Sequence, residues 1–387
     1  LLFRHHLTYK FKINFKGYWF STPFFKFHKL MNRILLFVSL IFLASCGGGD
    51  SNENIPPQSN DDFDRTVCLA NIYDNIAMVA FDEFQEKLET LDMSTNAYKE
   101  SPNDVSLLNT LRDDWYEAYI AWQHIEVFSH FGIGEDILYG FKMNTYPTDI
   151  NRTQNILNGI AQFNPAYNDN QGFPALEYLI YGVADNDQEI STILSEPNAL
   201  VLIGNIVSEM KANTSSVYSW WAKNRTTIVD DNSSTATSSL NLLINDFVYH
   251  YEKGFRTNKF GIPCGYFSGG QTFAEKIEGY YAGNISKTLA LNSLFSISNV
   301  FEGRSHSDGS VIGESMYTYL KYLQEDALAD EILTKLDEVE VSINNLENDF
   351  AVQVNTNNNE LENTFNLIQS VVANFKIDLW HGLGSEN

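Results

Sequence analysis

Apolar residues recur mainly at helical spacing along the chain from Phe63 onward. Alternating runs that would indicate strands are scarce, as are the short turns that join hairpins. Pro102 and Pro174 stand where helices are expected to begin. The pattern therefore predicts an all-α fold. The expected helices cover residues 64–92, 104–131, 149–161, 173–181, 192–224, 235–256, 271–282, 286–302, 312–323, 325–351 and 357–381.

The length of the helical part predicts two domains. About 325 residues exceed what one helical bundle core usually organises, so we expect two bundles. The polar stretch "GVADNDQE" at 182–189 follows a glycine stop and precedes a long helix, so we divide the chain into residues 63–190 and 191–387. A second irregular stretch, "NKFGIPCGYFSGG" at 258–270, is rich in glycine and aromatics and is typical of a packed loop.

The first 62 residues do not follow the helical pattern. Residues 1–30 lack Asp and Glu and do not begin at a methionine, so we interpret them as translated upstream sequence. Residues 31–45 combine Arg33, an apolar run and small residues, which indicates a signal peptide. Their ending before Cys46 resembles the lipobox of bacterial lipoproteins, and residues 46–62 are typical of a flexible tether. We therefore expect lipid on Cys46, which would anchor the protein to a membrane; an ordinary secretory signal is the alternative.

The net charge limits the kinds of binding partner that we expect, and the cysteines limit the possible disulfide and zinc sites. Residues 1–45 hold 7 of the 25 Lys and Arg, so the remaining 18 basic and 49 acidic side chains give a formal charge of −31. Such an acidic protein repels phosphate backbones, so nucleic acid is not expected as a partner. Cys68 and Cys264 lie far apart in the sequence, and whether they form a disulfide stays open. Zinc-type Cys and His spacing is absent from the sequence.

One acidic residue interrupts the apolar face of the helix expected in "QGFPALEYLIYG". Phe173, Leu176, Glu177 and Ile180 follow the i, i+3, i+4, i+7 rule and share one face. An unpaired buried carboxylate costs several kcal/mol, so Glu177 requires a base, a set of donors or a cation. The simplest alternative to a binding role is a structural glutamate that accepts hydrogen bonds from backbone or tyrosine.

A second carboxylate ends an aromatic stripe in "WYEAYIAWQHIEVFSHFG". Trp115, Tyr119, Trp122 and Glu126 share a helix face, and His130 lies four residues beyond Glu126. A Glu and a His at this spacing can reach one ion, although such a pair also arises in ordinary solvated or core faces. Helical bundles build metal sites from inward Glu and His on facing helices. The sequence therefore offers Glu126, His130 and Glu177 as candidate ligands for a divalent or trivalent metal ion.

These segments resemble the imelysin-like family of bacterial envelope proteins. "QGFPALEYLIYG" is similar to the family's Gly-x-His-x-x-Glu signature: Gly172 and Glu177 match, and Pro174 stands where the family has histidine. "WYEAYIAWQHIE" resembles a second family helix, in which Tyr119 replaces an arginine and Trp122 a tyrosine. The resemblance extends over about residues 63–379. The Asp-rich close of the family is missing from "DLWHGLGSEN".

The resemblance implies a binding site between the two bundles and a lipid-anchored protein of the cell envelope, at the outer membrane, linked to iron uptake. Its ligand-binding residues would be Gly172, Pro174, Glu177, Tyr119, Trp122, Glu126 and Glu278. Glu278 comes from "EKIEGYYAGNISKTLALN", similar to another family segment, although an exposed helix residue is an equal alternative.

We therefore expect a non-catalytic binding component of iron or haem uptake. Metallopeptidase activity is the first alternative, because an early family member was described as a metallopeptidase. It is disfavoured here because proline supplies no metal ligand and no His-Glu-x-x-His spacing occurs. The second alternative is a structural partner of an outer-membrane transporter.

Overall fold

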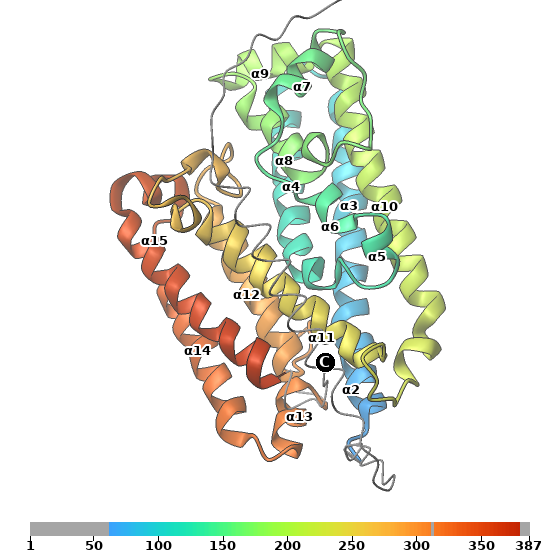
Figure 1. Cartoon of the computed structure of the whole chain (residues 1–387). Coiled ribbons are helices and arrows are strands. Elements are labelled where there is room, and N and C mark those ends of the chain that lie inside the picture. The colour runs from blue at the N-terminus through green and yellow to red at the C-terminus, as the bar shows by residue number, and fades with distance from the viewer. Residues whose placement is uncertain (1–61, 311–312, 380–387) are drawn as a thin grey trace, which may run out of the picture. The chain divides into compact units, whose positions relative to one another are not determined.

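The described part of this computed structural model comprises residues 62–310 and 313–379. It contains helices and connecting loops and no β-strand, so the all-α prediction is confirmed (Figure 1). The expected lipid site at Cys46 and the rest of residues 1–61 lie outside the described residues.

Three long helices form the frame of the first half of the described chain. The segments α2 (Arg65–Asn71), η1 (Ile72–Ala77) and α3 (Met78–Glu100) follow one another without a break. Asp104 caps α4 (Val105–Ile125), which returns along α3. Helix α10 (Pro197–Val229), which begins with proline in its first turn, packs on the same helix (Figure 1).

Short helical segments connect α4 to α10. These are η2 (Glu126–Phe128), α5 (Ile133–Asp136), α6 (Tyr139–Met143), α7 (Ile150–Leu157), η3 (Asn168–Asn170), α8 (Gly172–Glu177), η4 (Tyr178–Gly182) and α9 (Asp187–Leu194).

The second half of the described chain packs mainly on itself. Its segments are α11 (Ser239–Tyr249), η5 (His250–Gly261), η6 (Tyr266–Ser268), η7 (Ala274–Lys276), α12 (Ser286–Glu302), α13 (Met316–Tyr322), α14 (Asp326–Asn344), α15 (Phe350–Ala373) and η8 (Asn374–Leu379). Helix α12 packs on both α4 and α14, and so joins the two halves (Figure 1).

Contacts alone do not divide the described chain in two, because residues 61–387 form one compact unit. Helix α10 lies within the part expected to be the second bundle, yet it packs along α3 of the first. The division into 63–190 and 191–387 therefore stays a prediction.

The prediction of a helix over residues 271–282 is wrong. Only Ala274–Lys276 forms a single 3₁₀ turn there, and Gly279 and Gly283 have φ of 75° and 62°. A Cβ on Gly279 would lie 2.5 Å from Ile285, so the backbone turns sharply at a position that only glycine fits. Glu278 consequently lies on a loop.

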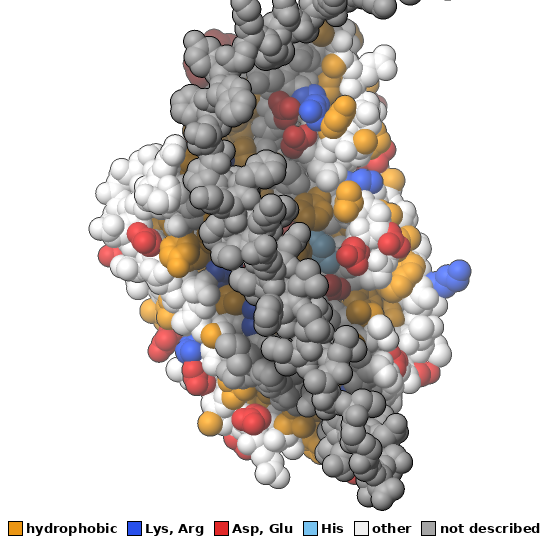
Figure 2. Space-filling view, in the orientation of Figure 1, with side chains coloured by type: hydrophobic (Ala, Val, Ile, Leu, Met, Phe, Trp, Pro, Cys, Tyr) orange, Lys and Arg blue, Asp and Glu red, His pale blue; other side chains and the backbone are white. Residues whose placement is uncertain are grey.

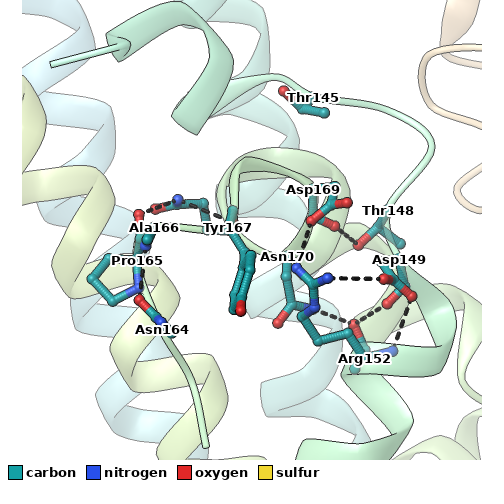
Figure 3. Close-up of polar contacts among 12 residues, drawn as sticks. Thr145, Thr148, Asp149, Arg152, Asn164, Pro165, Ala166, Tyr167, Asp169 and Asn170 are labelled. Atoms are coloured by element: carbon teal, nitrogen blue, oxygen red, sulfur yellow. Dashed lines mark hydrogen bonds and ion pairs between the residues drawn. The ribbon is translucent and has the colours of Figure 1, made fainter. Parts of the chain in front are cut away.

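The loop before α8 is held in place by ionic and ring contacts. The Arg152 guanidinium forms ion pairs with Asp149 at 3.5 Å and Asp169 at 3.1 Å, and it lies 3.7 Å from the ring centre of Tyr167 (Figure 3). Asn170 donates a hydrogen bond to Thr153. These contacts fix the chain that leads into Gly172.

Among the helices of the described residues, no single one has the length and apolar content required to cross a bilayer. The bent pair α9 and α10, with 89° between its members, meets that test only when both are counted together.

Candidate functional site

Glu278 is the centre of a buried polar cluster. Its side chain is 3% exposed, and its Oε1 accepts hydrogen bonds from Gln123 Nε2 at 3.0 Å and from Asn144 Nδ2 at 2.7 Å. Its backbone carbonyl accepts from the Ser286 hydroxyl, which ties the loop to the start of α12. The alternative of an exposed helix residue is therefore wrong, and Glu278 joins the expected site as a buried carboxylate.

Lys259 supplies the positive charge of the cluster from the π-helical segment η5. Its ammonium donates to Glu278 Oε2 and, at 2.7 Å, to Gln123 Oε1. The same Nζ lies 3.9 Å from Glu126 Oε2. Two buried carboxylates thus share one buried ammonium, which is how such charges are tolerated away from water.

Asn144 connects the two carboxylates to an aromatic ring. Its Nδ2 donates to Glu126 Oε1 at 2.9 Å as well as to Glu278, and its Oδ1 accepts from the Tyr119 hydroxyl at 2.7 Å. Glu126 is 8% exposed, as the aromatic stripe predicts, and its Oε2 is buried without a hydrogen-bond partner. This oxygen therefore makes no hydrogen bond, and the Lys259 ammonium 3.9 Å away is its ion-pair partner.

Two tyrosines bordering the cluster stay protonated. Burial raises the pKa of Tyr119 well above its usual value, and the nearby Glu278 carboxylate raises it further. The pKa of Tyr146 is raised for the same reasons, burial first and then Glu278 and Glu126. Both phenols therefore keep their protons, and the Tyr119 hydroxyl donates its hydrogen to Asn144.

Tyr119 and Trp122 belong to the aromatic core. Tyr119 stacks on Phe173 with ring centres 4.4 Å apart and 2° between the planes, and Trp122 has no exposed surface. Trp115 donates its Nε1 hydrogen to the Phe173 carbonyl. Of the aromatic residues expected at the site, Tyr119 touches the polar cluster through its hydroxyl, and Trp122 packs behind it.

Glu177 accepts hydrogen bonds from the backbone, which is the structural role that the sequence offered as the alternative to ligand binding. Its Oε1 accepts from the backbone N–H groups of Tyr281 at 2.7 Å and Ala282 at 2.9 Å, which joins α8 to the Glu278 loop. Burial raises the pKa of this carboxyl to about 8, against the lowering effect of the two backbone donors. Glu177 is therefore largely neutral at pH 7.

The glycine and proline of the motif shape the start of α8. Gly172 has a φ of 72°, and a Cβ there would lie 2.2 Å from the Met143 carbonyl oxygen, so the close approach of α6 requires glycine. Pro174 is buried and brings no donor atom to the site.

The expected metal ligands are not gathered in one place. His130 Nδ1 contacts the Ser129 hydroxyl at 3.1 Å, and its ring packs against Phe141 and Tyr249. Burial lowers the pKa of His130. Within the described ranges, the three metal-binding side chains whose ligand atoms lie within 4.8 Å of one another are those of Glu83, His124 and His306. The ligand atoms of Glu126, His130 and Glu177 do not form such a group.

Sequence reasoning missed Lys259, Asn144 and Gln123. Lys259 did carry a signal, because a lysine beside Phe260 within the segment "NKFGIPCGYFSGG" needs an acidic partner if that segment is packed. Asn144 and Gln123 carried none, since amides in helical stretches are usually solvated.

Comparison with known proteins gives the family. The family model described as Imelysin matches residues 77–375. The chain belongs to the imelysin family. No curated protein gives a significant match.

Two solved structures share the imelysin fold with this chain. One is an iron-regulated protein A precursor from Parabacteroides distasonis, with a TM-score of 0.61 and 15% identity over 82% of this chain and 96% of the other. The second is an imelysin-like protein from Psychrobacter arcticum, with a TM-score of 0.59 and 17% identity over 82% of this chain and 94% of the other.

Proposed function

We propose that this imelysin-family protein is a non-catalytic binding component of iron or haem acquisition in the bacterial cell envelope. The observation that carries the proposal is the buried cluster of Glu126, Glu278, Asn144 and Tyr119 around Lys259. It presents oxygen donors in a fixed arrangement, and the Lys259 ammonium and the Asn144 amide contact both carboxylates. One of the similar solved structures is an iron-regulated protein A precursor, which supports the link to iron.

The donor atoms of the cluster fit iron as cargo. Carboxylate and phenol oxygens are hard ligands that suit a highly charged ion, and Glu126 Oε2 has no hydrogen-bond partner. An iron ion entering between the carboxylates would take over the charge that Lys259 now neutralises, so the ammonium has to move away. The phenol of Tyr119 would have to lose its proton to become a ligand.

Peptidase activity fits the motif region poorly. A hydrolytic metal site needs several protein ligands, an open position for water and a base. Pro174 offers no ligand, and Glu177 is bonded to backbone N–H groups. The same region thus supports a binding role over a catalytic one.

An envelope location is part of the proposal and rests on the sequence. Residues 31–45 read as a signal peptide and Cys46 as the lipidated residue, which would place the folded part at the outer membrane, on its periplasmic or surface side. The strongly acidic chain suits cationic partners. Figure 2 shows acidic side chains scattered over the visible face.

Thermal unfolding with a ferric salt or with haem tests the binding role. A ligand at 100 times its Kd stabilises the native state by about 2.7 kcal/mol, so the wild type should melt at a higher temperature with one of the two. Glu278→Gln should weaken that rise. The control Glu117→Gln, at a side chain 55% exposed and outside the cluster, should leave it unchanged. No rise with either ligand would refute the proposal.

Two further assays separate the alternatives. Cleavage of unfolded polypeptides that stops when a chelator is added would favour the metallopeptidase. Capture of an outer-membrane transporter that survives in the Glu126→Ala/Glu177→Ala variant, with no ligand-dependent rise in melting temperature, would favour a structural docking role.

A further inference from the structure

A group of metal-ligating side chains lies outside the buried cluster. Glu83 comes from α3, His124 from the end of α4, and His306 from the loop after α12, and their ligand atoms all lie within 4.8 Å of one another. The backbone N–H of His306 donates to the Asn75 carbonyl at 3.1 Å, which holds that loop against η1. Three segments far apart in the sequence thus converge on one point.

The contacts within this group leave one nitrogen unused. His306 Nε2 lies 2.5 Å from Glu83 Oε2, a direct hydrogen bond. His124 Nδ1 lies 3.7 Å from the same oxygen, too far for a hydrogen bond. It is buried and has no hydrogen-bond partner.

The second ring nitrogen of His124 fixes its tautomer. His124 Nε2 lies 2.9 Å from Asn292 Oδ1, and the Asn292 Nδ2 donates to the Thr288 carbonyl at 2.9 Å. Because an amide oxygen only accepts, His124 Nε2 carries the hydrogen. The lone pair of a neutral His124 is therefore on Nδ1 and faces the Glu83 carboxylate, and a proton or a metal ion held between these two atoms removes their repulsion.

We propose that Glu83 Oε2, His124 Nδ1 and His306 Nε2 bind a divalent transition-metal ion. Two imidazoles and one carboxylate form a donor set that suits Zn²⁺ or Fe²⁺, whereas Ca²⁺ and Mg²⁺ prefer oxygen ligands alone. The bond from His124 Nε2 to Asn292 is the outer contact that usually orients a metal-binding histidine.

The distances require only small side-chain shifts. Tetrahedral zinc with bonds of about 2.0–2.1 Å separates its ligand atoms by about 3.3 Å. The 3.7 Å gap from His124 to Glu83 would close slightly, and the 2.5 Å contact from His306 would open. His306 Nε2 would release its proton to solvent as the ion takes its place.

The surroundings favour entry of a cation. Glu83 is 40% exposed and gives the ion access, whereas the histidine side chains are 11% and 9% exposed. His124 also lines a pocket of about 570 Å³, whose walls carry the carboxylates of Glu302, Asp337 and Glu340 and one guanidinium, that of Arg304, which is paired with Glu302.

Titration of the chelator-treated, dialysed full-length protein with Co²⁺ and then Zn²⁺ tests the proposal. Co²⁺ bound by nitrogen and oxygen ligands should release protons as it binds and give visible absorption bands, and one equivalent of Zn²⁺ should then remove the bands. Glu83→Gln, His124→Gln and His306→Gln should each weaken binding at least about tenfold. His306→Gln is the most informative of the three, because it changes a loop residue and should leave the metal-free melting temperature near that of the wild type.

His130→Gln is the matched control, since His130 is another partly buried histidine outside the group. It should keep full Co²⁺ and Zn²⁺ affinity, as should Glu278→Gln, which changes the buried cluster. A wild type that binds no equivalent of either ion would overturn the proposal. So would unchanged binding in all three ligand variants. Neither result depends on whether the protein takes up iron or haem.

Discussion

Lys259 and Glu126 face each other as a buried ion pair, with Nζ and Oε2 3.9 Å apart. They come from η5 and η2, which are 133 positions apart in the sequence. The pair is completed by Glu278, which accepts a hydrogen bond from the same ammonium. A cluster with two carboxylates and one ammonium is stable only while the ammonium stays in place.

Lys259→Met should therefore lower the free energy of unfolding by about 3–5 kcal/mol, because it leaves Glu126 and Glu278 buried without a counter-charge. Urea unfolding at neutral pH measures the loss. The control Lys211→Met removes a lysine paired with Glu89 and Asp92 nearer the surface, and should cost less than about 1 kcal/mol. A Lys259→Met protein as stable as the control would contradict the proposed charge balance.

The stability of the protein should depend on the protonation of Glu177. The folded pKa is about 8, whereas the unfolded chain titrates near about 4.3. Below both values the carboxyl is protonated in either state. As pH rises through this window only the unfolded chain loses the proton, so the free energy of unfolding falls by up to about 1.4 kcal/mol per pH unit and levels off above about pH 8.

Glu177→Gln removes this dependence, because the amide oxygen still accepts from Tyr281 and Ala282 but does not titrate. Relative to the wild type, the variant should gain more than about 1 kcal/mol between about pH 5 and pH 8 in denaturant unfolding. Asp246, whose pKa burial raises to about 7, acts in the same window in both proteins and cancels in the difference. Parallel pH profiles would show that Glu177 is ionised throughout.

Gly172→Ala should destabilise the protein more than an alanine at another left-handed glycine. The new Cβ would overlap the Met143 carbonyl oxygen, so overpacking of about 1–3 kcal/mol adds to a backbone cost of about 1–2 kcal/mol. Gly269→Ala is the control, since its φ is 65° and nothing lies within 4 Å of the added Cβ. Equal losses in urea unfolding would mean that the approach of α6 to α8 is loose.

The thiols of Cys68 and Cys264 should be free and slow to react. Both are buried and unbridged, and burial raises the pKa of each. In a Cys46→Ser variant, a thiol reagent should react slowly with the native protein. After denaturation without a reductant, the same reagent should label both Cys68 and Cys264. Thiols that appear only after reduction would establish the disulfide that the sequence left open.

The sequence predicts long helices well because their apolar spacing is local. The helix expected over 286–302 coincides with α12, and Glu126 and Glu177 are buried, at 8% and 3% exposure, as their apolar faces require. The break between the last two long helices lies later in the prediction than in the structure, where Asp349 caps α15. A cap depends on one side chain and is easily overlooked beside a strong apolar pattern.

The partners within the site could not be predicted in the same way. Glu177 reaches backbone N–H groups of a loop 104 positions away, and Glu126 reaches a lysine from another helical segment. Nothing in the spacing of either helix specifies these partners. The partners of Glu177 depend on how the loop around Gly279 turns, and the partner of Glu126 depends on how η5 packs. The Glu83, His124 and His306 group was missed for the same reason: each residue looks ordinary within its own segment.

If the buried cluster takes up iron as proposed, the ammonium of Lys259 would make it selective as well as stable. A cation that enters the cluster must displace the Lys259 ammonium, which the fold holds beside the carboxylates. The attraction between the entering cation and the two carboxylates increases with the charge density of the cation. Abundant monovalent ions would therefore lose this exchange, and weakly held divalent ions would gain little from it. A small trivalent ion would gain the most, so the lysine would act as a threshold against monovalent and weakly held divalent ions.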